Sequence, residues 1–185
     1  RQDVQRWRAR SSAILTGSGT VLADDPSMNA RVDGPVEQPT RVIVDSQWRT
    51  PPDGRMFDTP GPVIIAGNAD VEIPGELAAS AASCLPMPVQ EGGINLHALM
   101  SGLAGLQVNE LQVEAGGRLC GALLNAQLID EILVYQAPVL LGSGCSGPFA
   151  FGPLESMADR THLKVLETCH LGEDLRIRLQ PESEF

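Results

Sequence analysis

Residues 110–128, which read ELQVEAGGRLCGALLNAQL, contain a strand, a glycine turn and a helix in direct succession. Apolar and polar residues alternate over 110–114, which predicts a strand. The leucines of 119–128 recur on one helical face, which predicts an amphipathic helix. Gly116 and Gly117 form the turn between them. A strand, a short turn and a helix in this order are the unit of α/β proteins with parallel sheets.

Short apolar runs bounded by turn residues recur along the rest of the chain and predict further strands. These runs are 13–16, 41–45, 62–67, 131–135, 164–167 and 175–179. Alternation of such strands with helices, including a modest helix over 96–103, predicts an α/β fold with a mostly parallel sheet and flanking helices. The last two runs face each other across 170–174, so we expect a C-terminal antiparallel hairpin at a sheet edge. Two stretches rich in glycine and proline, 33–39 and 49–62, are expected to be loops.

The composition restricts the function. The net charge of −10 argues against non-specific binding of nucleic acid. No apolar run reaches the roughly 18 residues of a membrane span, and the polar first ten residues do not resemble a signal peptide. The four cysteines and three histidines are dispersed, so we expect no metal site and reduced thiols in a cytoplasmic protein.

Positive charge is concentrated near the N-terminus of this acidic chain. The arginines are Arg1, Arg6, Arg8, Arg10, Arg31 and Arg41. Such a cluster could hold a small anion. A solvated helix face explains the same pattern, and charge alone does not separate the two interpretations.

The stretch 142–147 matches the dinucleotide-binding pattern G-x-G-x-x-G. That pattern needs a helix to begin at its end and to direct its N-terminus at a pyrophosphate. The following stretch, 148–153, is PFAFGP, which is unfavourable for a helix. We therefore expect a flexible loop there and no dinucleotide site.

The turn at 114–119 is the better candidate for phosphate binding. A strand ends at Glu114, two glycines turn the chain, and the backbone amides of the next helix would face an anion without hindrance. A plain strand–helix turn is the alternative. The stretch 17–26 also follows a strand and combines glycines, hydroxyls, Asp24 and Asp25, although Asp25-Pro26 is a common turn initiator as well.

Together these segments resemble the reductase domain of the bacterial bifunctional riboflavin biosynthesis proteins. The resemblance rests on TVLADDP at 20–26 followed by Arg31, RVIVDS at 41–46, EAGG at 114–117, and LIDE at 128–131 followed by YQAPVLLG at 135–142. Their order and spacing cover nearly the whole chain.

The resemblance implies a dihydrofolate-reductase-like fold over residues 1–185 and NADPH as the cofactor. It implies reduction of 5-amino-6-(5-phosphoribosylamino)uracil to the ribitylamino product by a homodimer. It also implies a first strand and a zinc deaminase domain upstream of residue 1, so zinc is expected only there and not in this chain.

The resemblance further implies roles for individual residues. Three residues are expected to contact NADPH: Thr20, Asp24 and Ser46. The loop expected to cradle its phosphates consists of Gly116, Gly117, Arg118, Leu119, Cys120, Gly121 and Ala122. The residues expected to contact substrate are Arg8, Met28, Arg31 and Glu114. Of all these, Asp24 and Glu114 are expected to act in catalysis.

Two other functions remain open on the sequence. A reductase of the same fold could act on a folate or a pterin. The chain could also be a dimerisation module that has lost activity. Arg8 and Arg31 favour a phosphorylated substrate, since guanidinium groups bind phosphate in bidentate fashion.

Overall fold

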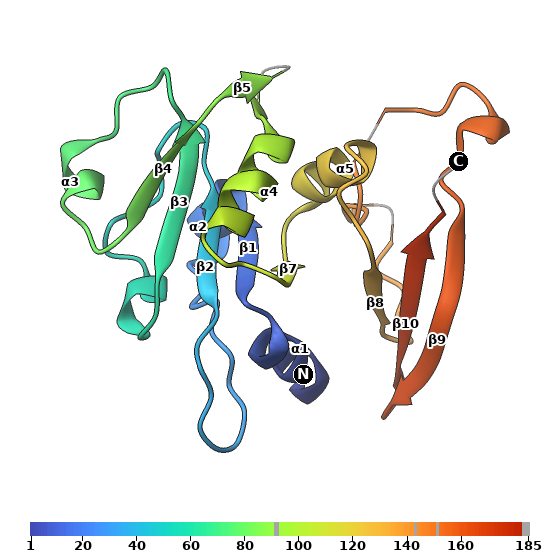
Figure 1. The fold of residues 1–185 in the computed structure, drawn as a ribbon. Coiled ribbons are helices and arrows are strands. Elements are labelled where there is room, and N and C mark those ends of the chain that lie inside the picture. The colour runs from blue at the N-terminus through green and yellow to red at the C-terminus, as the bar shows by residue number, and fades with distance from the viewer. Residues whose placement is uncertain (91–92, 143, 151, 183–185) are drawn as a thin grey trace.

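Two sheets and the helices packed on them make up the computed structural model, which describes residues 1–90, 93–142, 144–150 and 152–182 (Figure 1). The helices are α1 (Gln2–Arg10), α2 (Ser18–Asp24), α3 (Gly75–Ala78), α4 (Leu96–Gly105) and α5 (Gly117–Asn125), with 3₁₀ turns η1 (Arg55–Asp58) and η2 (Met157–Asp159). The strands are β1 (Ala13–Gly17), β2 (Thr40–Val44), β3 (Val63–Asn68), β4 (Ser83–Met87), β5 (Val89–Gln90), β6 (Gly93–Ile94), β7 (Leu111–Val113), β8 (Ile132–Gln136), β9 (Leu163–Leu171) and β10 (Asp174–Pro181).

The larger sheet has five strands in the order β4-β3-β2-β1-β7, and all its pairings are parallel. Successive side chains of each strand point to opposite faces of this sheet, and both faces are apolar. Leu15 and Val42 belong to a cluster that α4 covers with Leu99. Ile43 belongs to the cluster on the other face, to which α2, η1 and α3 contribute. The predicted α/β fold with a mostly parallel sheet covered on both faces is therefore confirmed.

The smaller sheet has three strands in the order β8-β10-β9, and both its pairings are antiparallel. The C-terminal hairpin is thus confirmed, but its expected place at an edge of the parallel sheet is wrong. Within the described residues, the backbone of β8 pairs with β10 and that of β7 pairs with β1. In Figure 1, β7 and β8 are the facing strands of the two sheets, and α5 lies above them.

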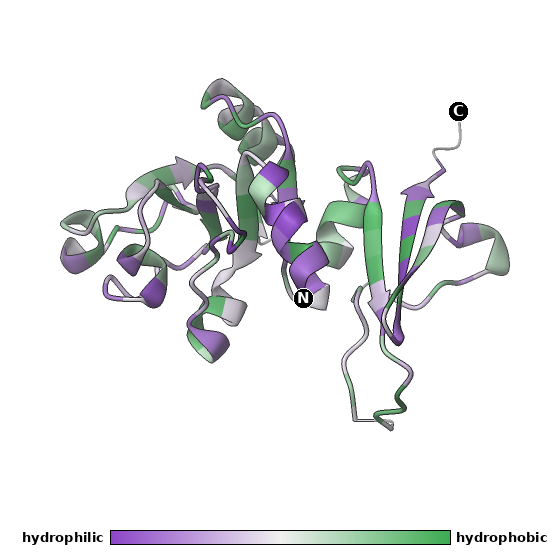
Figure 2. Ribbon diagram, turned by 90° about the horizontal axis from the view of Figure 1, so that it is seen from below, coloured by the Kyte–Doolittle hydropathy of each residue, from purple (hydrophilic) through white to green (hydrophobic). Residues whose placement is uncertain are grey.

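Helix α1 lies between the two sheets, and Figure 2 colours most of it hydrophilic. Its Asp3 accepts hydrogen bonds from Tyr135 of β8 and from Arg176 of β10. Its Arg8 reaches Glu114, directly after β7. A helix with no fully buried residue is therefore held mainly by polar contacts to both sheets.

Local structure differs from the prediction in two places. Residues 18–24, for which the sequence pattern predicted no helix, form α2, which ends where Asp25 adopts a left-handed conformation with φ 42°. The helix predicted over 119–128 ends at Asn125, because Gln127 is left-handed and Leu128 donates its amide to the Leu123 carbonyl. None of the helices in the described ranges is long and apolar enough to cross a membrane.

Candidate active site

Three neighbouring strands of the parallel sheet end at the edge where ligands bind in open α/β sheets. Ser46 follows β2, α2 with Thr20 follows β1, and Gly116 follows β7. Because β2 and β7 flank β1 on opposite sides, the chain order reverses at β1. The candidate cofactor residues therefore lie along the topological switch point of the sheet.

The start of α5 is open on one side only. Gly116 is the N-cap, and a Cβ atom at this position would meet no atom within 4 Å. A Cβ atom at Gly121 would lie 2.3 Å from the Ala150 carbonyl oxygen, and the Ala150 amide donates to the Gly117 carbonyl over 2.8 Å. Gly117 and Gly121 thus admit a returning backbone segment, whereas Gly116 leaves the first amides of the helix accessible.

Glu114 is held by a bidentate ion pair. Arg8 donates from Nε to Oε1 over 2.7 Å and from its second terminal nitrogen to Oε2 over 2.5 Å. Gln112 also donates to Oε1 over 2.8 Å. The hydrogen bonds from the guanidinium to Glu114 raise the pKa of Arg8. The carboxylate is therefore fixed in orientation, and Oε2 keeps room for another donor.

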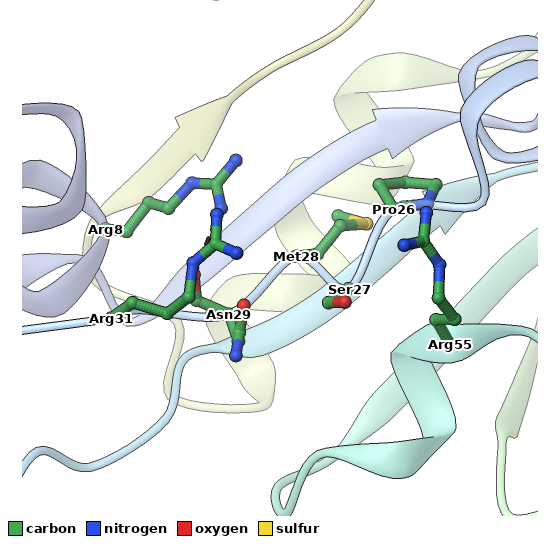
Figure 3. Close-up of a pocket in the computed structure, with 7 residues that line it drawn as sticks. All are labelled: Arg8, Pro26, Ser27, Met28, Asn29, Arg31 and Arg55. Carbon is green, nitrogen blue, oxygen red and sulfur yellow. Dashed lines mark hydrogen bonds between the residues drawn. The ribbon is translucent and has the colours of Figure 1, made fainter. Parts of the chain in front are cut away.

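A cavity of about 220 Å³ opens beside this ion pair (Figure 3). Three arginines, Arg8, Arg31 and Arg55, line it together with residues 26–29. Arg8 also donates to the Asn29 carbonyl over 3.0 Å. The cavity is thus cationic and polar, as an anion site requires. A second cavity of about 400 Å³ lies at the amino ends of β1 and β2, lined by Ser12 and Thr40 among others.

The loop after β2 is built around a buried carboxylate. Asp45 accepts hydrogen bonds from the amide and hydroxyl of Thr50 over 2.7 and 2.8 Å. Trp48 adopts a φ of 53°, and its ring occupies the space that a side chain at Gly67 would need. Arg49 donates to the Ser18 hydroxyl over 3.0 Å, with 55% of its side chain exposed. The loop therefore presents Arg49 close to the start of α2.

Two arginines of the N-terminal cluster do not face an anion site. Arg41 is fully buried and donates to the carbonyl oxygens of Thr59, Gly61 and Pro62. Burial lowers the pKa of Arg41. Arg10 pairs with Glu110. The arginines that are close in sequence therefore lie in different places in the fold, because they belong to different helices, strands and loops.

The structure brings the predicted substrate residues together. Arg8, Met28 and Arg31 line one cavity, and Arg8 holds Glu114. Asp24 ends α2 two residues before the segment 26–29 that lines the cavity. The predicted cofactor residues, Thr20, Ser46 and 116–122, occupy the adjacent strand edge.

Arg55 and Asn29 are cavity residues that the sequence did not indicate. Arg55 belongs to 49–62, predicted only as a loop, and no local pattern relates it to Asp25. The glycine-rich stretch 142–147 includes Ser143, which lies outside the described residues. The carbonyl oxygen of its Gly147 lies where it would meet a Cβ atom at Gly117 at 2.8 Å. In the described part of the chain, no group of three or more His, Cys, Asp or Glu side chains could hold a metal ion.

A parallel sheet, a glycine-capped helix at its switch point and an adjoining cationic cavity define an α/β protein with its ligand site at the strand ends. The chain belongs to the RibD C-terminal domain family, whose model matches residues 1–177.

Individual relatives agree with this assignment. The chain is 40% identical to riboflavin biosynthesis protein RibD of Escherichia coli, over 97% of this chain and 51% of that protein. It is 31% identical to the 5-amino-6-(5-phosphoribosylamino)uracil reductase of Buchnera aphidicola, over 98% of this chain and 92% of that protein. The structure of Acinetobacter baumannii RibD superimposes with a TM-score of 0.85 at 35% identity, over 98% of this chain and 50% of that one. The chain thus spans about half the length of the RibD proteins it matches.

Proposed function

We propose that this protein reduces 5-amino-6-(5-phosphoribosylamino)uracil to 5-amino-6-(5-phosphoribitylamino)uracil with NADPH, in riboflavin biosynthesis. The observation that supports it most is the arginine-lined cavity next to the glycine-capped start of α5. The relative from Buchnera is named as this reductase, and the match covers 92% of its length, which supports the same reaction.

The residues at the strand edge fit the cofactor. The open position above Gly116 and the first amides of α5 suit a phosphate, because they offer donors and a positive helix end. Thr20 and Ser46 would contact the rest of the nucleotide from the ends of β1 and β2. Bound NADPH would supply the hydride, so the protein has to bind, orient and exclude water.

The cavity residues suit the phosphorylated substrate. Arg31 is exposed at the cavity and can bind its phosphate in bidentate fashion. Glu114 can accept an N–H of the aminouracil at Oε2, in the orientation that Arg8 imposes. The ribosylamine opens to an imine, whose first sugar carbon takes the hydride and whose nitrogen takes a proton. Asp24, at the end of α2, can relay that proton from water or orient the nicotinamide.

The decisive experiment measures NADPH oxidation with the ribosylaminouracil phosphate and, separately, with dihydrofolate. We expect turnover of the first alone. Turnover of dihydrofolate alone would support the folate or pterin alternative, and failure to bind NADPH would support the inactive module. Arg31→Ala should raise the substrate KM far more than the NADPH KM, and Arg6→Ala, an exposed arginine of α1, is the matched control.

Arg49 supports a preference for NADPH over NADH. Its half-exposed guanidinium lies at the end of β2 with Ser46, and Asp45 and Ser18 restrain it. A 2′-phosphate is the group that distinguishes the two nucleotides, and a guanidinium suits it. Arg49→Gln should weaken NADPH binding at least tenfold and leave NADH binding nearly unchanged in a fluorescence titration.

A homodimer through β9 is part of the proposal. Among the described residues β9 pairs with β10 alone, and its apolar side chains Leu163, Val165 and Leu166 are exposed. A long apolar edge strand favours pairing with a second copy, and two-fold dimers are the commonest assembly. Val165→Asp should therefore lower the mass measured by analytical ultracentrifugation from dimer to monomer.

The full protein is proposed to carry a further strand and a zinc deaminase domain before residue 1. The unpaired sides of β7 and β8 support the strand, because each pairs with one neighbour in the described residues. A chain extended upstream should protect the β7 and β8 amides from hydrogen exchange more strongly than residues 1–185 alone. We also propose a cytoplasmic location, which fits NADPH chemistry and dispersed cysteines.

A further inference from the structure

Arg55 binds the turn that ends α2. Its backbone amide donates to Oδ1 of Asp25 over 2.9 Å, and its Nε donates to Oδ2 over 3.1 Å. A terminal guanidinium nitrogen donates to the Asp24 carbonyl over 2.8 Å. Two of the three side-chain nitrogens of Arg55 are thus directed at two consecutive residues of one turn.

The turn that Arg55 holds is strained. Asp25 has a φ of 42° and Met28 a φ of 47°, so two non-glycine residues within four positions are left-handed. Such conformations cost free energy and persist where surrounding contacts impose them. Pro26, Ser27 and Met28, which directly follow Asp25, line the cationic cavity. The shape of this cavity wall therefore depends on contacts that hold the left-handed residues.

The residues on either side of Arg55 support this contact. Gly54 precedes Arg55, and a Cβ atom there would approach Oδ1 of Asp25 to 3.2 Å. Helix η1 is fixed in turn by Met56, which is fully buried in the core cluster that includes Val21 of α2. Arg55 is therefore attached to the same core as the turn it binds, which makes it a firm anchor.

Figure 3 shows Arg55 on the opposite side of the cavity from Arg8 and Arg31, with Ser27 and Met28 between them. We propose that Arg55 is a positioning residue for the phosphorylated substrate. It fixes the Asp24–Asp25 turn, and thereby the course of the following residues Pro26, Ser27 and Met28, which line the cavity. The inference rests on the proposed function, since that function puts the substrate in this cavity.

A double-mutant cycle with Asp25→Gly tests the inference. Glycine adopts a φ of 42° without cost and removes the carboxylate, so the turn no longer needs the contact with Arg55. We expect Arg55→Met to raise the substrate KM about tenfold in the wild-type background and less than twofold in the Asp25→Gly background. Arg55→Lys keeps a donor and should give an intermediate KM. Arg31→Met is the matched control and should raise KM equally in both backgrounds.

Hydrogen exchange gives a readout independent of activity. The amides of 24–29 should exchange faster in Arg55→Met, and those of β2 should not change. An equal rise of KM in both backgrounds would overturn the inference in favour of direct contact between Arg55 and the phosphate. An unchanged KM in Arg55→Met would overturn it outright. If the wild-type protein fails to reduce the ribosylaminouracil, the proposed function itself is refuted, whereas the other two outcomes leave that function intact.

Discussion

The two sheets of this protein are stabilised by different forces. Every strand of the parallel sheet except β7 contributes buried apolar residues to the core clusters. In the described part of the antiparallel sheet, Ile132 of β8 is the one buried apolar residue, at 9% exposure. The same sheet exposes Val165 by 60% and Leu163 by 42%. Apolar burial thus accounts for the stability of the parallel sheet but not for that of the antiparallel sheet.

Polar contacts with α1 hold the antiparallel sheet in place. Arg176 and Arg178 of β10 both bind Glu167 of β9, and Arg178 also binds Glu131 just before β8. Tyr135 donates to Asp3 of α1 over 2.7 Å. Burial and the neighbouring carboxylate of Asp3 raise the pKa of Tyr135 well above its ordinary value. Helix α1 therefore contacts both sheets, through Asp3 on one side and through the site residue Arg8, which binds Glu114 after β7, on the other.

The largest expected effect comes from removing apolar contacts in the parallel sheet. Ile43→Ala should lower the free energy of unfolding by about 3 kcal/mol, because Ile43 is fully buried and a cavity remains. Val165→Ala on β9 should change it by less than about 0.5 kcal/mol when both proteins are measured as monomers, in which Val165 is exposed. Urea denaturation of the two variants measures both values. Equal losses would contradict the contrast between the sheets.

The next effect comes from removing the carboxylate that links α1 to the second sheet. Asp3→Ala should cost about 2 kcal/mol, because it leaves Arg176, 11% exposed, with one fewer partner. Hydrogen exchange should accelerate in β8 and β10 and remain unchanged in β2 and β3. Glu155→Ala, an exposed carboxylate, is the control. A uniform loss of protection in both sheets would mean that they unfold as one unit.

Low pH should loosen the second sheet before the first. Burial would raise the pKa of Asp3, but hydrogen bonds from Tyr135 and Arg176 outweigh it and lower the value below 3.8. The hydrogen bonds from Arg178 lower the pKa of Glu131 below 4.5. A depressed carboxyl pKa stabilises the folded state above the ordinary pKa, and this stability is lost as pH falls through the folded value. Exchange in β8 and β10 should therefore rise below about pH 4, and Asp3→Asn should reduce this dependence. A pH dependence that Asp3→Asn leaves unchanged would rule out Asp3 as its source.

The smallest expected effect concerns Trp7. Arg10, Arg178 and Arg176 lie 4.5, 5.6 and 6.0 Å from its ring centroid. Trp7→Leu keeps apolar contact but removes these cation–π interactions, so it should cost about 0.5–1 kcal/mol. Thermal unfolding against wild type measures the loss. A loss as large as that of Ile43→Ala would show that α1 is held mainly by apolar burial.

The sequence by itself determined the elements whose cause is local. Apolar runs predicted β1, β2, β3, β7, β8 and the hairpin, since alternation of buried and exposed positions is written into neighbouring residues. The glycine turn at 116–117 also needed no tertiary information, because two glycines between a strand and an amphipathic helix define it. The resemblance assigned Arg8, Met28 and Arg31 to the substrate, and the structure places all three along one cavity.

Only the tertiary structure decided how distant segments meet. It divided the strands into two sheets, buried Arg41, and joined Arg55 to Asp25 across 30 positions of sequence. It also made a helix of 18–24, where the packing of Val21 against the sheet outweighs the two nearby glycines. These outcomes depend on hydrogen bonds and burial between segments far apart in the chain. A local pattern therefore cannot express them.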